Sequence, residues 1–91
     1  MGKIVAQFNI PGFTAAKYSQ VIKDLDAAGK EKSSGRLNHV AAQQPDGLLI
    51  IDVWESEDAL NKFSETLIPI LLKNGVKPAQ PVLLPLHNII V

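Results

Sequence analysis

The sequence predicts an α+β domain whose elements follow the order strand, helix, strand, strand, helix, strand. Four segments have the composition and alternation of β-strands, and two place apolar residues at helical spacing. Proline and glycine mark most of the junctions between them. A length of 91 residues corresponds to one domain, spanning 1–91, and 46% hydrophobic residues exclude a disordered or fibrous chain.

The first strand and the first helix are predicted in the N-terminal third. Residues 3–10 alternate, with Ile4, Ala6, Phe8 and Ile10 on one face. Pro11 and Gly12 end this strand, and Thr14 is suited to cap a helix. An apolar stripe follows at i, i+3, i+4 and i+7, formed by Tyr18, Val21, Ile22 and Leu25, which we therefore assign to the core. Gly29 ends the helix, and residues 30–35 are predicted to form a loop.

The middle of the chain predicts a β-hairpin and a second helix. Residues 37–44 and 48–54 are apolar strands around Pro-Asp-Gly, a strong turn signal. Ser56 is suited to cap the second helix, whose stripe consists of Ala59, Leu60, Phe63 and Leu67. Because proline cannot donate to the helical ladder, we expect a kink or a restart at Pro69. The last strand is predicted over residues 82–90.

The strands at residues 48–54 and 82–90 are apolar on both faces. A strand of this kind needs cover on both sides, whereas two helices cover only one face of a four-stranded sheet. The uncovered face would be a larger apolar patch than soluble monomers usually expose. The sequence therefore predicts a homodimer that packs sheet against sheet, since two-fold dimers are the commonest closed assembly. The alternative is that some of these apolar residues tolerate exposure to water.

The overall charge and the composition exclude several classes of function. Nine basic and nine acidic residues give no electrostatic reason to expect nucleic acid or an anionic membrane as a partner. The absence of cysteine excludes disulfides, thiolate chemistry and cysteine-based zinc sites, and it fits a cytoplasmic protein. The longest apolar runs, 48–51 and 67–72, are far too short to span a membrane.

The run Asp-Val-Trp-Glu-Ser-Glu-Asp-Ala-Leu-Asn-Lys-Phe at residues 52–63 resembles the dimeric α/β-barrel superfamily, in particular the antibiotic biosynthesis monooxygenase type. There a Trp-x-Ser-x-x-Ala-x-x-Phe pattern joins the third strand to the second helix. Residues 11–14 and 35–40 are also similar to small members of the superfamily. The resemblance implies a ferredoxin-like fold: a four-stranded antiparallel sheet with two helices on one face, paired into a dimeric α/β barrel.

The superfamily includes cofactor-free oxygenases, lactone isomerases and haem-degrading enzymes, and the last class can be tested residue by residue. Haem-degrading members use an asparagine on the first strand, and a tryptophan and a histidine ten residues apart on the second helix. Asn9 matches the first position, but Phe63 and Lys73 stand at the other two. We therefore expect no haem degradation and no cofactor.

The register of the hairpin decides which polar side chains meet. A two-residue loop at Asp-Gly places His39 opposite Trp54, and a four-residue loop places it opposite Asp52. An odd loop would instead bring Val40 near Asp52. In the first two cases His39, Asp52 and Trp54 share a face, where His39 can act as a general base oriented by Asp52. The alternative is that His39 and Asp52 form a buried pair whose hydrogen-bonding groups satisfy each other beside Trp54 in the core.

The remaining candidates concern a ligand pocket between the sheet and the helices. We expect Phe8, Trp54 and Phe63 to line it, with Asn9 or His87 adding a polar group. A lone strand histidine such as His87 is more often half-exposed or at an interface. Two histidines are too few for a catalytic zinc site, so we predict no metal. The basic residues Lys30, Lys32 and Arg36 are expected to be solvated.

These observations lead to one main hypothesis and two alternatives. The main hypothesis is a cofactor-independent monooxygenase or isomerase that acts on a small apolar or aromatic molecule. The first alternative is a non-catalytic dimeric module that binds a small ligand or another protein. The second is a dimer whose polar residues are purely structural.

Overall fold

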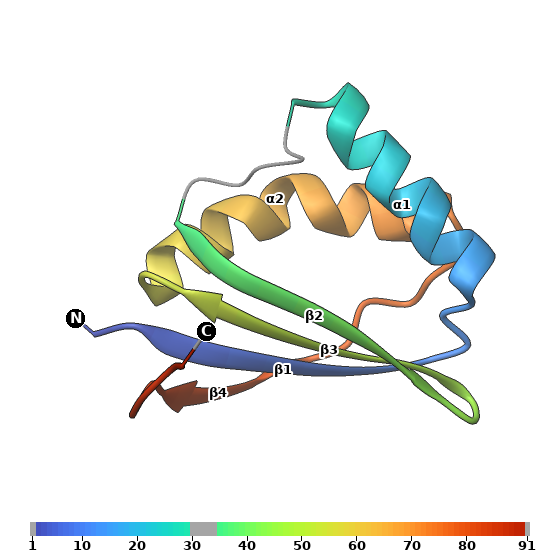
Figure 1. Cartoon of the computed structure of the whole chain (residues 1–91). Helices are drawn as coiled ribbons and strands as arrows, with labels where there is room; N and C mark the ends of the chain where they lie inside the picture. Colours follow the sequence, from blue (N-terminus) through green and yellow to red (C-terminus); the bar gives the residue numbers. More distant parts are fainter. Residues whose placement is uncertain (1, 30–34, 91) are drawn as a thin grey trace.

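The computed structural model describes residues 2–29 and 35–90, in which four strands and two helices follow the predicted order (Figure 1). The elements are β1 (Ile4–Pro11), α1 (Ala15–Ala27), β2 (Arg36–Gln44), β3 (Gly47–Trp54), α2 (Glu57–Lys73) and β4 (Val82–Pro85). The strands form one antiparallel sheet in the order β2-β3-β1-β4. This is the ferredoxin-like α+β fold that the sequence predicted.

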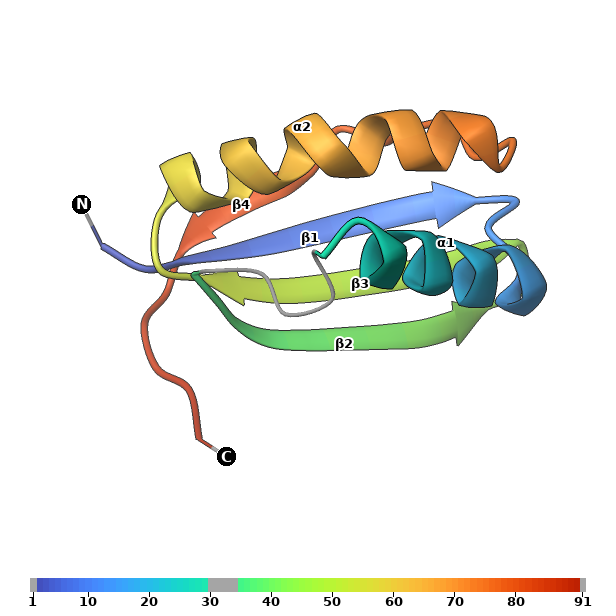
Figure 2. The same ribbon diagram turned by 90° about the horizontal axis from the view of Figure 1, so that it is seen from above.

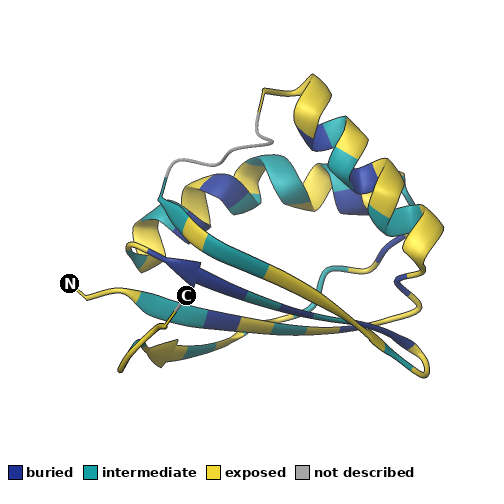
Figure 3. Cartoon of the chain, in the orientation of Figure 1, coloured by how far each residue is buried: buried dark blue, intermediate teal, exposed yellow. Residues whose placement is uncertain are grey.

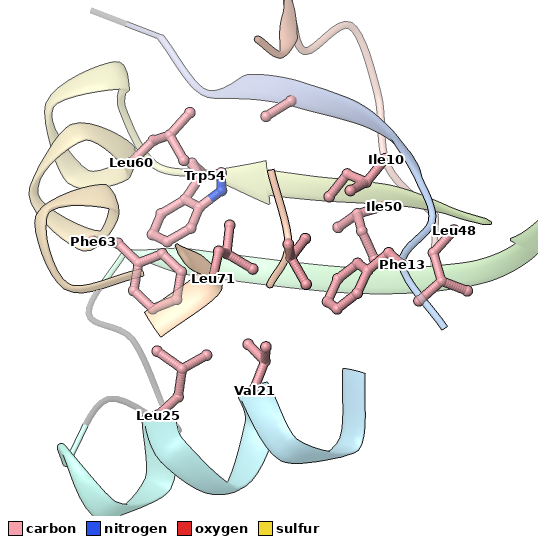
Figure 4. Close-up of a cluster of buried hydrophobic side chains, with 12 residues drawn as sticks. Ile10, Phe13, Val21, Leu25, Leu48, Ile50, Trp54, Leu60, Phe63 and Leu71 are labelled. Carbon is pink, nitrogen blue, oxygen red and sulfur yellow. The ribbon is translucent and has the colours of Figure 1, made fainter. Parts of the chain in front are cut away.

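Both helices lie on the same face of the sheet (Figure 2). The core lies between the two layers (Figure 4) and consists of Ala6, Ile10, Phe13, Val21, Leu25, Leu48, Ile50, Trp54, Leu60, Phe63, Leu71 and Val76. Val21, Leu25, Leu60 and Phe63 come from the predicted helical stripes, whereas Leu71 follows the predicted stripe of the second helix, and the core residues of β1 and β3 come from alternate positions. Apolar periodicity therefore determines which face each element turns to the core.

Each helix begins at the residue that the sequence indicated. The Thr14 Oγ1 accepts a hydrogen bond from the Lys17 backbone N–H at 3.2 Å, and the Ser56 Oγ accepts one from the Ala59 N–H at 3.1 Å. These side chains satisfy N–H groups that have no partner within the helix. Of the expected kink or restart at Pro69, the restart is wrong, because α2 continues through this residue to Lys73. Packing of α2 on the core outweighs the single backbone hydrogen bond that proline cannot make.

The turn of the hairpin differs from the expected Asp-Gly loop. The turn residues are Pro45 and Asp46, while Gly47 opens β3 and pairs with Gln44. A side chain at Gly47 would collide with the Ile10 carbonyl oxygen, so this glycine serves close strand packing. The register is nevertheless the one that sets His39 opposite Asp52.

The last strand is shorter than predicted. β4 ends at Pro85, because proline lacks the N–H that would extend the ladder. The Leu86 N–H still donates to the Lys3 carbonyl at 3.0 Å, but residues 86–90 form no strand. Val91 and residues 30–34 of the predicted loop at 30–35 lie outside the described residues.

The sheet face that points away from the helices carries exposed apolar side chains. Val40, Val82 and Leu84 are 49%, 55% and 52% exposed. Their pairing places all three on this outer face, opposite to the face of Ala6 and Ile10. In Figure 3 the edge strands β2 and β4 are mostly exposed or half-buried, while the inner strand β3 is mostly buried.

Candidate functional site

A cavity of about 390 Å³ lies between the sheet and the helices. Its lining is mostly apolar and aromatic, and includes Phe8 from β1, Phe13, Tyr18 from α1, and Phe63 from α2. A volume in this range is typical of small-molecule sites. Phe8 and Phe63 therefore line this cavity, which is the position that the sequence analysis gave them.

His39 and Asp52 meet on the cavity side of the sheet. They are direct partners across β2 and β3, and both line the cavity. The His39 Nδ1 lies 2.6 Å from the Asp52 Oδ1, and Asp52 is buried at 5% exposure. A buried carboxylate is costly unless it is paired, and this hydrogen bond satisfies it.

Tyr18 extends this pair into a chain of three side chains. Its hydroxyl oxygen lies 2.7 Å from the His39 Nε2, and the two ring planes are within 3° of parallel. An ionised Asp52 can only accept, so the His39 Nδ1 carries the proton and Nε2 of the neutral ring is an acceptor. The Tyr18 O–H therefore donates to His39, which in turn donates to Asp52.

Tyr18 was assigned from the sequence to the core alone, and its polar role was missed. The helical stripe correctly turns it toward the sheet, but the periodicity treats it as an apolar residue. The signal that could have revealed its role is the phenolic hydroxyl, which usually finds a hydrogen-bond partner when buried. Only the tertiary structure identifies His39 as that partner.

The pKa of Tyr18 is raised above its ordinary value. The main cause is burial, which disfavours the phenolate, and the nearby Asp52 charge acts in the same direction. The Arg36 guanidinium opposes both by favouring the phenolate. Tyr18 is therefore a neutral hydrogen-bond donor at physiological pH.

Arg36 lines the cavity, contrary to the expectation that it is merely solvated. Its guanidinium carbon lies 5.6 Å from the centre of the Phe63 ring, a distance at which a cation is attracted to an aromatic face. The charge patterns of a sequence do not reveal such a contact, because the two residues come from different elements. The site thus contains a cation beside the chain of Tyr18, His39 and Asp52.

Trp54 does not line the cavity, so its expected role as an aromatic wall is wrong. It is 0% exposed and packs on Phe63, with ring centres 5.3 Å apart (Figure 4). Its Nε1 has no hydrogen-bond partner among the described residues. The aromatic walls are instead Phe8, Phe13, Tyr18 and Phe63.

The structure also places Asn9 and His87 away from the cavity. Asn9 pairs with Leu49 on the outer face of the sheet and is exposed, because alternate residues of a strand point to opposite faces. His87 follows the end of β4 and is also exposed. Neither residue belongs to the cavity lining, so the pocket prediction was wrong for both.

Within 2–29 and 35–90, no three His, Cys, Asp or Glu side chains lie close enough together to hold a metal ion. No helix in this part of the chain has the length and apolarity needed to cross a membrane.

Comparison with solved structures identifies the class of fold. SnoaB, a cofactor-independent oxygenase from Streptomyces nogalater, aligns over 96% of this chain and 93% of its own, with a TM-score of 0.62 and 17% identity. The monooxygenase ActVA-Orf6 of Streptomyces coelicolor, solved with nanaomycin D, aligns over 98% of this chain and 89% of its own, with a TM-score of 0.58 and 20% identity. A Caulobacter crescentus protein assigned to the antibiotic biosynthesis monooxygenases aligns over 96% of this chain and 88% of its own. Its TM-score is 0.56 and its sequence identity is 22%.

At these identities the comparisons establish a shared fold. The chain therefore has the ferredoxin-like fold of antibiotic biosynthesis monooxygenase-type proteins. Neither the models of known protein families nor the curated proteins include a match to this sequence.

Proposed function

We propose that this protein is a cofactor-independent monooxygenase or isomerase that acts on a small apolar, aromatic molecule. The observation that carries the proposal is the hydrogen-bonded chain Tyr18–His39–Asp52 beside an apolar cavity of about 390 Å³. A base oriented by a buried carboxylate is a common arrangement for proton abstraction. The oxygenase and monooxygenase that share the fold add support for this class of reaction.

The proposed first step is removal of a proton from the substrate. The Tyr18 oxygen takes the substrate proton as its own proton passes to the His39 Nε2, and Asp52 stabilises the resulting imidazolium. In an isomerase the carbanion is reprotonated at another carbon. In a monooxygenase the carbanion reacts with dioxygen: a CH₂ group becomes a carbonyl that contains one oxygen atom, the other oxygen atom leaves as water, and the substrate supplies all four electrons that reduce dioxygen.

The test uses 2-tetralone, a two-ring ketone with an acidic CH₂ group, in deuterated buffer. We expect the protein to accelerate deuterium incorporation at this CH₂, measured by proton NMR. An oxygen electrode under the same conditions separates the two reactions, because only the oxygenase consumes dioxygen. No exchange above the buffer rate with bound 2-tetralone would contradict the enzymatic proposal.

A non-catalytic binding module is the second candidate, and one observation favours it. The Tyr18 hydroxyl already occupies the His39 Nε2, so the polar groups of the chain satisfy one another without a ligand. A self-satisfied chain of this kind can simply position a tyrosine at the wall of a binding site. Saturable binding of nanaomycin D, the ligand of ActVA-Orf6, without proton exchange or oxygen uptake would support this candidate.

We further propose that two copies pair through the outer faces of their sheets. The support is the set of exposed apolar residues on that face, Val40, Val82 and Leu84. Covering them with the same face of a second copy buries both patches at once.

A further inference from the structure

The turn that leads into α1 places Phe13 against the ring of Tyr18. Phe13 directly precedes the N-cap residue Thr14, and Tyr18 is the fourth residue of the helix. Apolar side chains at these two positions often pack on each other and fix the direction in which the chain enters a helix. Here the ring centres lie 5.8 Å apart and the ring planes meet at 63°, an edge-to-face arrangement that aromatic pairs favour. Phe13 is 3% exposed, so the core holds it in place.

Tyr18 also contacts the ring of His39. The two rings are parallel, with 6.1 Å between their centres, and the His39 Nε2 accepts the hydrogen bond from the Tyr18 hydroxyl at 2.7 Å. A side chain that lines a cavity has space on one side, into which its ring can turn about the side-chain torsions. The Phe13 ring restricts this freedom, because it packs on the same ring that has to bring its hydroxyl to the imidazole.

The turn that precedes α1 is itself fixed to the hairpin of β2 and β3. The Gly12 N–H donates to the Asp46 carbonyl oxygen at 2.6 Å, which joins this turn to the turn of the hairpin. Gly47 follows Asp46 and packs so closely on β1 that a side chain there would collide with the Ile10 carbonyl oxygen. The helix that carries the hydroxyl and the hairpin that carries the imidazole are therefore held together at their turns.

We propose that Phe13 is a positioning residue, which holds the Tyr18 ring so that its hydroxyl reaches the His39 Nε2. The contacts between the turns fix the two backbones, and the Phe13 ring fixes the side chain that joins them. The inference rests on the proposed function, in which the Tyr18 oxygen receives the substrate proton and passes its own proton to His39. Because Phe13 also lines the cavity, its effect on Tyr18 is measured without a ligand as well as during turnover.

The first test is a pH titration of the tyrosine absorbance in Phe13→Leu and Phe13→Met without any ligand. Both variants keep a large apolar side chain and remove the ring, and substitutions of this kind are usually tolerated in a core. We expect the Tyr18 transition at a lower pH than in wild type. A ring that is held less tightly is better hydrated and donates less to His39, and both changes favour the phenolate.

The second test is the exchange of deuterium into 2-tetralone by the same variants. We expect kcat to fall by about 10- to 100-fold with KM unchanged, the scale on which a misplaced catalytic group slows a reaction. Val53→Ala is the control, because it removes apolar volume from a similarly buried residue on the outer face of the sheet. This control should keep the wild-type kcat and the wild-type Tyr18 transition, and circular dichroism establishes that each variant is folded.

The outcomes separate this inference from the proposed function. A wild-type Tyr18 transition and a wild-type kcat in both ring-free variants would overturn the positioning role. An increase in KM alone would also overturn it, because Phe13 would then be only a wall of the cavity. If wild type catalyses no exchange, the proposed function fails, whereas the ligand-free titration still decides whether Phe13 holds Tyr18.

Discussion

Tyr18 gives direct spectroscopic access to the site, because it is the one tyrosine in the chain. Its phenolate absorbs near ultraviolet light that the phenol does not, so a pH titration of this absorbance reports Tyr18 alone. Since burial raises its pKa, we expect the transition above about pH 10, the value of a free tyrosine. Arg36→Met should move the transition further up, because the guanidinium lowers this pKa.

The same shift has a consequence for stability. A group whose pKa is higher in the folded state stabilises the fold fully below its unfolded pKa, and this contribution is lost as the pH rises through the folded pKa. Unfolding by urea should therefore become easier above about pH 10, and Tyr18→Phe should lack this component. An absorbance transition at the ordinary tyrosine pKa would contradict the burial of Tyr18. A transition that does not move up in Arg36→Met would contradict the effect of Arg36 on this pKa.

At the residue level, the sequence identified part of the site. His39 and Asp52 could be paired because strand alternation and loop length restrict which residues face each other. The contact of Tyr18 with His39 joins residues 21 positions apart from different elements, and no local pattern encodes it. Asn9 was wrongly assigned to the pocket, because strand alternation puts its side chain on the sheet face that is opposite to the face of Phe8.

Among the elements, the two helices are joined at their C-terminal ends by Asp24. Its Oδ2 accepts from the Asn74 Nδ2 at 2.9 Å, its Oδ1 accepts from the Gln20 Nε2 at 3.0 Å, and the Lys73 Nζ lies 3.6 Å away. The hydrogen bonds from Asn74 and Gln20 lower the pKa of Asp24, and Lys73 adds to this. The carboxylate thus links α1 to the end of α2.

The lowered pKa predicts an acid-sensitive contribution to stability. A carboxyl whose pKa is lower in the folded state stabilises the fold above its unfolded pKa, and this contribution is lost as the pH falls through the folded pKa. We expect Asp24→Asn to be less stable than wild type at pH 7, with a difference that shrinks on acidification to about pH 3, below the ordinary aspartate pKa. Urea unfolding of both proteins at a series of pH values between these two limits measures the difference in their free energies of unfolding.

Asp26→Asn, which changes an exposed carboxyl on the same helix, is the matched control and should cost less stability than Asp24→Asn at pH 7. A difference between wild type and Asp24→Asn that does not depend on pH would show that the contact is not electrostatic.

The elements themselves were largely predictable, because periodicity, caps and turns are local signals. Two of the departures depend on tertiary contacts. α2 continues through Pro69 because its face packs on the core, and the bulge at Arg36 to Asn38 is visible only once β2 and β3 are paired. β4 stops at Pro85, a break that the apolar run of residues 82–90 concealed.

For the whole molecule, the proposed pairing makes a prediction about mass in solution. Light scattering coupled to size exclusion should give twice the chain mass of 9.9 kDa at micromolar concentration. The double variant Val40→Lys, Leu84→Lys places charges on both edges of the outer face and should yield monomers. Leu72→Lys changes an equally exposed apolar residue on α2 and should leave the dimer intact.

A monomeric wild type, or a double variant that stays dimeric, would contradict this pairing. Circular dichroism establishes that each variant is folded.

The catalytic role of the chain from Asp52 to Tyr18 is tested most directly by the exchange rate of 2-tetralone in Tyr18→Phe. This variant keeps the ring and removes the hydroxyl that is hydrogen-bonded to the His39 Nε2 at the cavity. We predict a loss of about 100-fold or more in exchange rate, the scale of general acid–base catalysis, with the affinity for 2-tetralone unchanged. If Tyr18→Phe exchanged deuterium into 2-tetralone at the wild-type rate, this result would contradict the catalytic role of the chain.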